Sequence, residues 1–363
     1  MHVPDGFINA PVSAAAGVVA AGAVAVSLRG ARREQGGTSR SSGGENGGER
    51  TAPLAGLVAA FIFAVQMLNF PVAAGTSGHL LGGALAAILV GPYTGVLCIS
   101  VVLLMQGILF ADGGLTALGV NITVMGVTTT VVSYALFRGL ATVLPRTRRS
   151  TTAAAFVAAL ISVPAAAGVF TLIYWIGGTT DVPIGKVLTA MIGVHVLIGI
   201  GEAVITGLTV GAVIAVRPDL VHGARGLTSP LKLRIDGELV DAPARQSVAP
   251  VAARSTRGLW ATGLVTTLVL AGFVSFYASA NPDGLEKVAA DKGIDKRVEE
   301  HAAKDSPLAD YGVKEISDAR LSGGLAGVIG VGATIVVGSG VFWTVRRRRT
   351  PDAPAGIRTE ETV

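Results

Sequence analysis

The sequence predicts an all-α integral membrane protein, and three observations carry this prediction. Half of the 363 residues are apolar and only 15% are charged, whereas about a quarter of a soluble domain is charged. Glycine is abundant, with 49 residues, and aromatic residues make up only 5% of the chain. This mixture is typical of transmembrane helices that pack through small residues. The basic residues gather between or after the apolar runs, a distribution that orients a membrane protein and does not indicate nucleic-acid binding.

The first apolar run covers residues 11–28. No basic residue precedes it and several arginines follow it, so it is not a typical signal peptide. The positive-inside rule then places the N-terminus outside the cell. Residues 29–52 are polar and rich in Gly, Ser and Glu, and we expect a flexible cytoplasmic insertion there.

Six further apolar runs complete a predicted seven-helix body. We expect these spans at residues 53–70, 80–90, 96–110, 115–137, 152–176 and 186–216. A loop at 72–79 should lie near the outer surface. The run at 80–90 is short for a hydrocarbon core of about 30 Å, so we expect a broken or partly re-entrant helix that protein buries.

The domain organisation follows from this count. We expect a seven-span body, a cytoplasmic linker, a two-span module with an extracytoplasmic loop, and a disordered tail, at residues 1–216, 217–256, 257–349 (loop 281–321) and 350–363 respectively. The module spans lie at 259–280 and 322–345, and the loop has a helix-favouring stretch at 295–304. Every basic cluster falls on the cytoplasmic side of this topology.

The N-terminal segment Met1-His2-Val3-Pro4-Asp5-Gly6-Phe7 carries the strongest chemical signal. A large second residue should protect Met1 from removal, so its amine would survive. This amine, the amide nitrogen of His2 and its imidazole Nδ1 close a five-membered and a six-membered chelate ring. A fourth nitrogen would complete a square plane, which suits Ni²⁺ or Cu²⁺ and is accessible to Co²⁺. Residues 4–6 read as a tight turn that folds the terminus back.

His79 is the candidate for the fourth nitrogen. The chain has five histidines, at positions 2, 79, 195, 222 and 301. His222 falls in the cytoplasmic linker and His301 in the polar outer loop. His79 follows the Gly-rich loop at the outer end of a helix, on the same membrane face as the N-terminus. The alternative is that His79 only caps or orients that helix.

His195 and Glu202 lie seven residues apart on one face of the last body helix. Ionisable groups inside a membrane are costly and are usually functional or paired. A metal or proton relay and a structural role are both open, and we favour the structural role. Polar residues near the outer helix ends either orient the ligands or join helices by hydrogen bonds: Gln66, Asn69 and Asn121.

These segments resemble the CbiM/NikM family, the substrate-capture components of energy-coupling factor transporters for cobalt and nickel. The resemblance covers residues 1–216 and rests on four segments: residues 1–7, 66–72, 75–82 and 195–202. It implies a seven-helix body whose inserted N-terminus binds the metal through the Met1 nitrogen, His2 and His79. Pro282-Asp283-Gly284-Leu285-Glu286 resembles the PDGLE segment of the small CbiN/NikN partner, which implies assistance with metal loading.

The resemblance also implies partners and a location. We expect a membrane coupling subunit and separate ATP-binding cassette ATPase subunits, since no G-x-x-x-x-G-K-[ST] loop is present. The protein should be a multi-pass plasma membrane protein in the lipid bilayer, with an extracytoplasmic N-terminus and a cytoplasmic C-terminus. No cofactor is expected beyond the transported Co²⁺ or Ni²⁺, and the choice between the two ions stays open.

No catalytic motif is present, so we expect a transporter component and not an enzyme. Two alternatives are an intramembrane metalloenzyme that uses His195 and Glu202, and a metal sensor that signals through the basic C-terminal tail.

Overall fold

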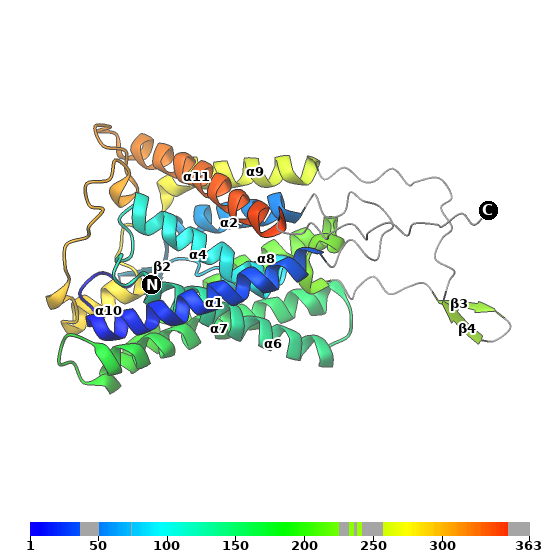
Figure 1. The fold of residues 1–363 in the computed structure, drawn as a ribbon, viewed down its shortest axis with the longest axis horizontal. Helices are drawn as coiled ribbons and strands as arrows, with labels where there is room; N and C mark the ends of the chain where they lie inside the picture. The colour runs from blue at the N-terminus through cyan, green and yellow to red at the C-terminus, as the bar shows by residue number, and fades with distance from the viewer. Residues whose placement is uncertain (37–50, 74, 225–231, 236–237, 242–256, 348–363) are drawn as a thin grey trace, which may run out of the picture.

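The computed structural model describes residues 1–36, 51–73, 75–224, 232–235, 238–241 and 257–347. Helices dominate these residues and run side by side along one long axis (Figure 1). Seven of the described helices are long and apolar enough to cross a membrane. The prediction of an all-α membrane protein is therefore confirmed.

The seven-helix body contains both full-length and short elements. Its seven helices are α1 (Ala10–Gly36), α2 (Thr51–Gln66), α3 (Gly83–Val90), α4 (Pro92–Leu109), one continuous helix at Leu118–Val143, α7 (Arg148–Gly177) and α8 (Ile184–Val216). The continuous helix consists of α5 (Leu118–Asn121), a π-helical segment (Ile122–Thr128) and α6 (Thr129–Val143). The C-terminal part contains α9 (Arg257–Gly272), α10 (Gly284–Lys292) and α11 (Ala319–Arg347). Two antiparallel hairpins pair β1 (Phe70–Ala73) with β2 (Thr76–Gly78) and β3 (Lys232–Ile235) with β4 (Glu238–Asp241).

The short helix α3 lies inside the bundle. All of its residues from Gly83 to Leu89 are buried, and it packs against α4, α6 and α7. Protein thus covers a helix that is too short to span a bilayer, as the sequence led us to expect. Gly82, which precedes α3, has a φ of 87°, a left-handed conformation that favours glycine.

The first helix is longer than predicted. We expected the polar insertion to begin at residue 29, but α1 continues to Gly36. The carboxylate of Glu34 accepts hydrogen bonds from the backbone N–H groups of Tyr93 and Thr94, at 3.1 and 2.8 Å. These groups belong to the first turn of α4, whose free N–H groups favour an anion. Residues 37–50 of the predicted insertion and the predicted tail at 350–363 lie outside the described residues.

Three other expectations were wrong in detail. The predicted loop at 72–79 contains the β1–β2 hairpin. The span predicted at 115–137 runs from Leu118 to Val143 and includes a π-helical segment at Ile122–Thr128. The stretch 295–304 holds only a short 3₁₀ turn, and the helix of this loop is α10. The linker also contains two 3₁₀ turns and the β3–β4 hairpin.

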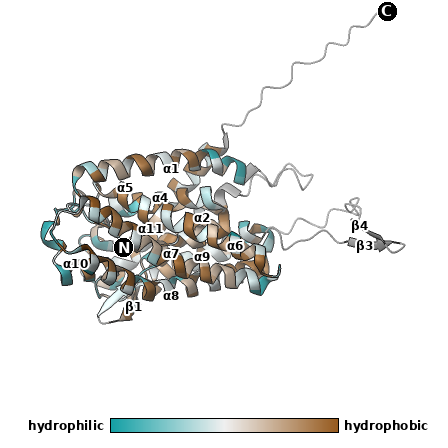
Figure 2. Ribbon diagram, turned by 90° about the horizontal axis from the view of Figure 1, so that it is seen from below, coloured by the Kyte–Doolittle hydropathy of each residue, from teal (hydrophilic) through white to brown (hydrophobic). Residues whose placement is uncertain are grey.

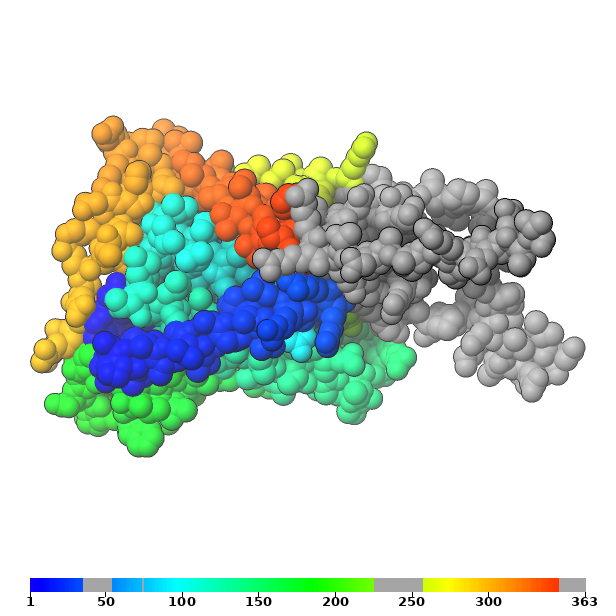
Figure 3. All heavy atoms as spheres, viewed as in Figure 1, coloured from blue at the N-terminus to red at the C-terminus, as the bar shows by residue number. Residues whose placement is uncertain are grey.

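The C-terminal helices join the bundle instead of standing apart from it. Helix α11 packs along α2 and α9, and α10 packs against α8. The segment between α10 and α11 crosses the end of the bundle that holds the N-terminus (Figure 3). Large apolar side chains remain exposed along the long helices, including Trp175, Leu208 and Val336, and the hydrophilic residues gather toward the helix ends (Figure 2). A lipid bilayer would cover such apolar flanks.

Candidate metal site

The first nine residues form a segment that is inserted into one end of the bundle. Met1 and Val3 are almost completely buried. Asn121 binds the backbone of Val3 on both sides, since its Oδ1 accepts from the Val3 N–H at 2.8 Å and its Nδ2 donates to the Val3 carbonyl at 3.1 Å. Asp5 accepts hydrogen bonds from the backbone and hydroxyl of Thr116, at 2.8 and 2.5 Å. Asn121, one of the polar residues singled out in the sequence, therefore holds the backbone next to His2.

The C-terminal module covers this inserted segment. The backbone N–H of Glu299 donates to the carbonyl of Asp5 at 3.0 Å. Gly6 has a φ of 85° and lies against the backbone of Arg297 and Glu299, so no side chain fits at this turn. His301 donates from Nε2 to the carbonyl of Gly113 at 3.2 Å, and its role here is therefore a contact with the body.

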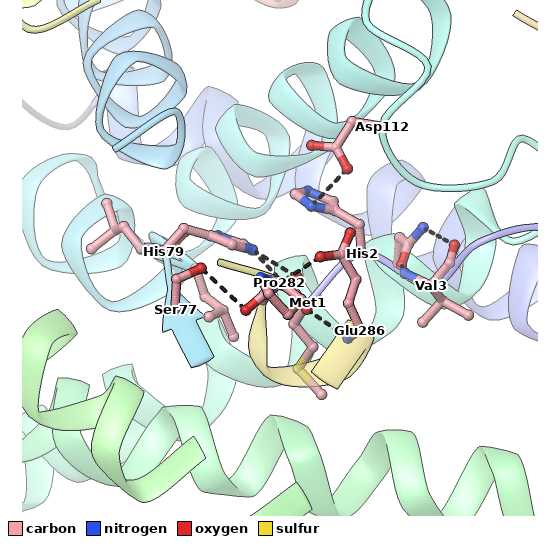
Figure 4. A network of polar contacts seen from close by, with 12 residues as sticks. Met1, His2, Val3, Ser77, His79, Asp112, Pro282 and Glu286 are labelled. Atoms are coloured by element: carbon pink, nitrogen blue, oxygen red, sulfur yellow. Dashed lines mark hydrogen bonds and ion pairs between the residues drawn. The ribbon is translucent and has the colours of Figure 1, made fainter. Parts of the chain in front are cut away.

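His79 and the Met1 amine face each other. The Nδ1 of His79 lies 3.0 Å from the carbonyl oxygen of Leu80, which can only accept. This nitrogen therefore carries the proton, and the lone pair is on Nε2. The nitrogen of Met1 lies 2.5 Å from this Nε2 (Figure 4). A second hydrogen bond that fixes the ring and its tautomer is typical of ligating histidines.

Glu202 and Gln66 hold the turn that carries His79. The carboxylate of Glu202, fully buried on α8, accepts from the backbone N–H groups of Leu81 and Gly82 at 2.5 and 3.0 Å. Gln66 donates from its side-chain amide to the Leu81 carbonyl at 3.0 Å. Both side chains thus support the backbone beside His79, and neither reaches the Met1 amine with a hydrogen bond.

His195 does not make the contacts that a relay with Glu202 would need, and Asn69 contacts the C-terminal module. His195 binds the carbonyl of Met191 through Nδ1 at 2.7 Å, and its Nε2 has no hydrogen-bond partner within the described residues. Within the described part of the chain, His195 and Glu202 form no hydrogen bond or ion pair with each other. The Asn69 carbonyl accepts from the backbone N–H of Ser279 at 2.7 Å, so this residue meets the C-terminal module through its backbone.

The imidazole of His2 is held by two residues that sequence reasoning missed. Its Nδ1 lies 3.1 Å from Oδ1 of Asp112, and its Nε2 lies 3.2 Å from Oε1 of Gln106. Burial lowers the pKa of His2 to about 4, although the carboxylate of Asp112 opposes this shift. The ring is therefore neutral at pH 7. It stacks on the ring of His79 with 5.0 Å between the ring centres.

A carboxylate from the C-terminal module completes the cluster. Oδ2 of Asp283 lies 2.7 Å from the Met1 nitrogen and 3.5 Å from Nε2 of His79. Burial alone would raise the pKa of Asp283, but the Met1 ammonium and His79 hold it well below its usual range. Among the described residues, His2, His79 and Asp283 offer ligand atoms that all lie within 4.8 Å of one another.

A cavity of about 580 Å³ opens beside this cluster. Both the body and the C-terminal module line it. Its ionisable lining includes one arginine, Arg320, and four acidic residues: Asp112, Asp283, Glu286 and Asp310. A cavity with this lining favours cations over anions.

These distances suit the binding of one divalent transition metal ion. Two ligand atoms that lie about 2.0–2.1 Å from a metal ion and at right angles are about 2.9 Å apart. The separations of 2.5, 2.7 and 3.5 Å between Met1, His79 and Asp283 are close to this value. The mixture of imidazole, amine and carboxylate donors suits nickel, cobalt, copper or zinc better than calcium or magnesium.

Known proteins with similar sequences point to the same chemistry. The family model "Cobalt uptake substrate-specific transmembrane region" (CbiM) matches residues 2–220, and the PDGLE domain model matches residues 257–347. A protein of Haloquadratum walsbyi assigned to metal transport is 38% identical over 61% of this chain and 93% of its own length.

Two other relatives carry the names of specific metals. A protein of Archaeoglobus fulgidus named as a fused nickel transport protein, NikMN, is 38% identical over 61% of this chain and 68% of its own length. The cobalt transport protein CbiM of Geobacter sulfurreducens is 40% identical over 30% of this chain and 31% of its own length. With more than half of its length matched by one family model, this chain belongs to the CbiM family of cobalt and nickel transport proteins of the membrane, with a PDGLE domain fused to it, and is not an enzyme.

Proposed function

We propose that this chain is the substrate-binding membrane component of an energy-coupling factor transporter and captures Ni²⁺ or Co²⁺ at its inserted N-terminus. The observation that carries the proposal is the approach of the Met1 nitrogen to 2.5 Å from the lone-pair nitrogen of His79. This separation supports the proposal because adjacent nitrogen ligands of one transition metal ion lie about 2.9 Å apart.

Four nitrogen atoms would bind the ion in a plane. They are the Met1 amine, the backbone nitrogen of His2, the imidazole Nδ1 of His2, and Nε2 of His79. The first three belong to one short chelate, and His79 closes the plane from the β1–β2 hairpin side. Square-planar nitrogen coordination suits Ni²⁺ best and is accessible to Co²⁺.

One rearrangement is required for this plane to close. In the structure Nδ1 of His2 faces Asp112, at 3.1 Å. Binding therefore turns the His2 ring away from Asp112 and toward the Met1 amine. The neutral ring would bind through the lone pair on Nδ1 with its proton on Nε2, so the protons released on binding come from the Met1 ammonium and the His2 amide.

The charge distribution supports an extracytoplasmic site. Among the described residues of 1–217, every Lys and Arg except Lys186 lies toward the bundle end opposite the N-terminus, where α1, α6 and α8 end and α7 begins: Arg29, Arg32, Arg33, Arg138, Arg146, Arg148, Arg149 and Arg217. The positive-inside rule assigns that end to the cytoplasm. A coupling subunit and ATPases on separate chains would then drive release of the ion inward.

The test is metal binding by the purified full-length chain with a free or a blocked N-terminus. Two extra residues before Met1 remove the chelating amine and should weaken Ni²⁺ binding at least ~100-fold, measured by calorimetry, with intact mass confirming the N-terminus. A His301→Ala variant keeps the amine and should bind as the unmodified chain does. Unchanged affinity in the extended chain would contradict the proposed ligand set.

A further inference from the structure

We propose that Asp283 is a loading ligand, whose carboxylate binds the incoming divalent cation together with the Met1 amine and His79 before the planar nitrogen set closes. This inference rests on the proposed function and deepens it. It gives the C-terminal module a direct chemical part in capture, through one oxygen atom.

The first argument is the way in which the two oxygens of Asp283 are used. Oδ1 accepts from the backbone N–H of Glu286 at 2.9 Å, and Glu286 accepts from the Asp283 N–H at 2.8 Å. This reciprocal pair is a capping box that begins α10. Oδ1 is thereby fixed, and Oδ2 is left to face Met1 and His79 as a one-oxygen ligand.

The second argument is the geometry of the three donors. Nε2 of His79, the Met1 nitrogen and Oδ2 of Asp283 form a triangle with sides of 2.5, 2.7 and 3.5 Å. The point in their plane that is equally far from all three is about 1.8 Å from each, slightly less than the ~2.1 Å of a metal–nitrogen bond. An ion at bonding distance therefore lies about 1 Å to one side of the triangle, so that these donors occupy one face of it.

The third argument is how firmly the module is docked beside His79. Ser77, two residues before His79, donates from its backbone N–H to the Pro282 carbonyl at 2.8 Å and from its hydroxyl to the Asn281 carbonyl at 2.8 Å. On the other side, Gly284 lies against α8 so closely that an added Cβ would be 2.7 Å from Ile198 and 2.8 Å from Val194. These contacts hold the Asp283 carboxylate within 2.7 Å of the Met1 nitrogen and 3.5 Å of Nε2 of His79.

The fourth argument is access. Asp283 lines the cavity, as do Asp112, Glu286 and Asp310. One carboxylate oxygen of Glu286 accepts from the backbone N–H of Asp283 at 2.8 Å, and Oδ2 of Asp283 is the carboxylate oxygen that faces Met1 and His79 at the buried end. A hydrated cation that enters the cavity meets this oxygen together with Nε2 of His79.

The carboxylate ligand is temporary because the final plane has no place for it. The chelate supplies three nitrogens and His79 the fourth, so that His2 replaces Asp283 when its ring turns from Asp112. Besides the metal–ligand bonds, one N–H bond of the Met1 ammonium and the N–H bond of the His2 amide are broken when these nitrogens bind the ion, and both protons pass to water. The cation gains nitrogen ligands and loses one oxygen ligand. This exchange is favourable because Ni²⁺ and Co²⁺ prefer nitrogen ligands to a carboxylate oxygen.

The test compares Asp283→Asn with Asp310→Asn in the full-length chain. Both substitutions remove one negative charge from the cavity lining, but only the first removes the loading ligand, and asparagine can still cap α10. Stopped-flow absorption follows Co²⁺ or Ni²⁺ binding, and equilibrium spectra report the final complex. We expect Asp283→Asn to slow association at least ~10-fold and to leave the final spectrum and stoichiometry unchanged. Asp310→Asn should change the rate by less than ~2-fold.

Asp283→Glu keeps a carboxylate and should recover most of the association rate. This recovery would show that slow association in Asp283→Asn comes from loss of the carboxylate and not from disturbed folding. Association of Asp283→Asn at the rate of the unmodified chain would overturn the proposal. An altered final spectrum would also overturn it, since Asp283 would then be a permanent ligand. These outcomes differ from failure of the proposed function. In that case, the chain with a blocked N-terminus would bind metal as tightly as the chain with a free N-terminus.

Discussion

The seven-helix body and the C-terminal module supply different donor atoms to the same candidate site. The body provides nitrogen atoms, from Met1, His2 and His79, and fixes them through contacts with its own backbone, such as the bond from His79 to Leu80. The module provides an oxygen atom, on Asp283, and holds it through its own capping box. Nitrogen donors discriminate among transition metal ions, whereas a carboxylate binds most divalent cations.

The comparison separates the two steps of capture. If the body selects the ion and the module delivers it, substitutions in the body should change the equilibrium affinity, and substitutions in the module should change the rate of loading. The predictions below test this separation, from the largest expected effect to the smallest.

His79→Ala should have the largest effect. It removes the fourth nitrogen, and the other histidine of the cluster, His2, already supplies its own nitrogen in the proposed plane. We expect Ni²⁺ affinity to fall at least ~100-fold in calorimetry on the purified chain. Thermal unfolding of the variant without metal should remain close to that of the unmodified chain. Unchanged Ni²⁺ affinity at the original stoichiometry would remove His79 from the ligand set.

Glu202→Gln should have the second-largest effect on Ni²⁺ affinity, because Glu202 holds the turn that carries His79. The N–H groups of Leu81 and Gly82 donate to different oxygens of Glu202, and Gln replaces one of these oxygens by an NH₂ group, which cannot accept. Loss of one hydrogen bond to a charged group costs about 1.5–3 kcal/mol, and we expect ~10-fold weaker Ni²⁺ binding together with a lower unfolding temperature. His195→Gln, on the same helix but without a bond to this turn, is the matched control. Equal losses in both variants would argue for a relay that joins the two residues.

Gly284→Ala should affect loading more than affinity. The added Cβ would meet Ile198 and Val194 at less than 3 Å and displace the start of α10. We expect association several-fold slower, about 3–10-fold, with an unchanged final spectrum. Gly293→Ala, at the other end of α10, strains a left-handed turn without touching α8 and serves as the comparison. If both glycine variants load at the same rate, the docking of α10 on α8 has no part in loading.

Asp112→Asn should have the smallest effect. Asp112 holds the His2 ring in the structure but is not one of the proposed final ligands. We expect a change of less than ~5-fold in equilibrium affinity, equivalent to about 1 kcal/mol. A loss as large as that of His79→Ala would mean that Asp112 binds the ion, and the proposed turn of the His2 ring would then be wrong.

Part of this site could be predicted from the sequence because it depends on topology. His79 and the N-terminus lie at the same end of the bundle in any arrangement with the predicted helix order, so their meeting follows from hydrophobic periodicity and charge. Asn121 was also identified, although its particular partner, the backbone of Val3, was not. A structural role was favoured for Glu202 because an ionisable group buried in a helix bundle needs partners, and its partners in the structure are the backbone N–H groups of Leu81 and Gly82.

The remaining residues could not be predicted because they depend on packing between distant segments. Asp283 is 204 positions from His79 in the chain, and nothing in its own segment specifies the body residue it meets. Asp112 and Gln106 were missed because their roles depend on where the His2 ring points. One signal was available and not used: Asp283 and Glu286 have the spacing of a capping box, which predicts the start of α10.

The magnetic state of the Ni²⁺-loaded protein tests the central claim most directly. A square plane of four nitrogen atoms makes Ni²⁺ diamagnetic, whereas octahedral or tetrahedral coordination leaves it paramagnetic. The proposed ligand set predicts a diamagnetic complex, seen as an NMR spectrum of the purified full-length chain with no paramagnetic shifts after one equivalent of Ni²⁺. A paramagnetic complex that keeps an oxygen ligand from Asp283 would contradict the planar nitrogen site.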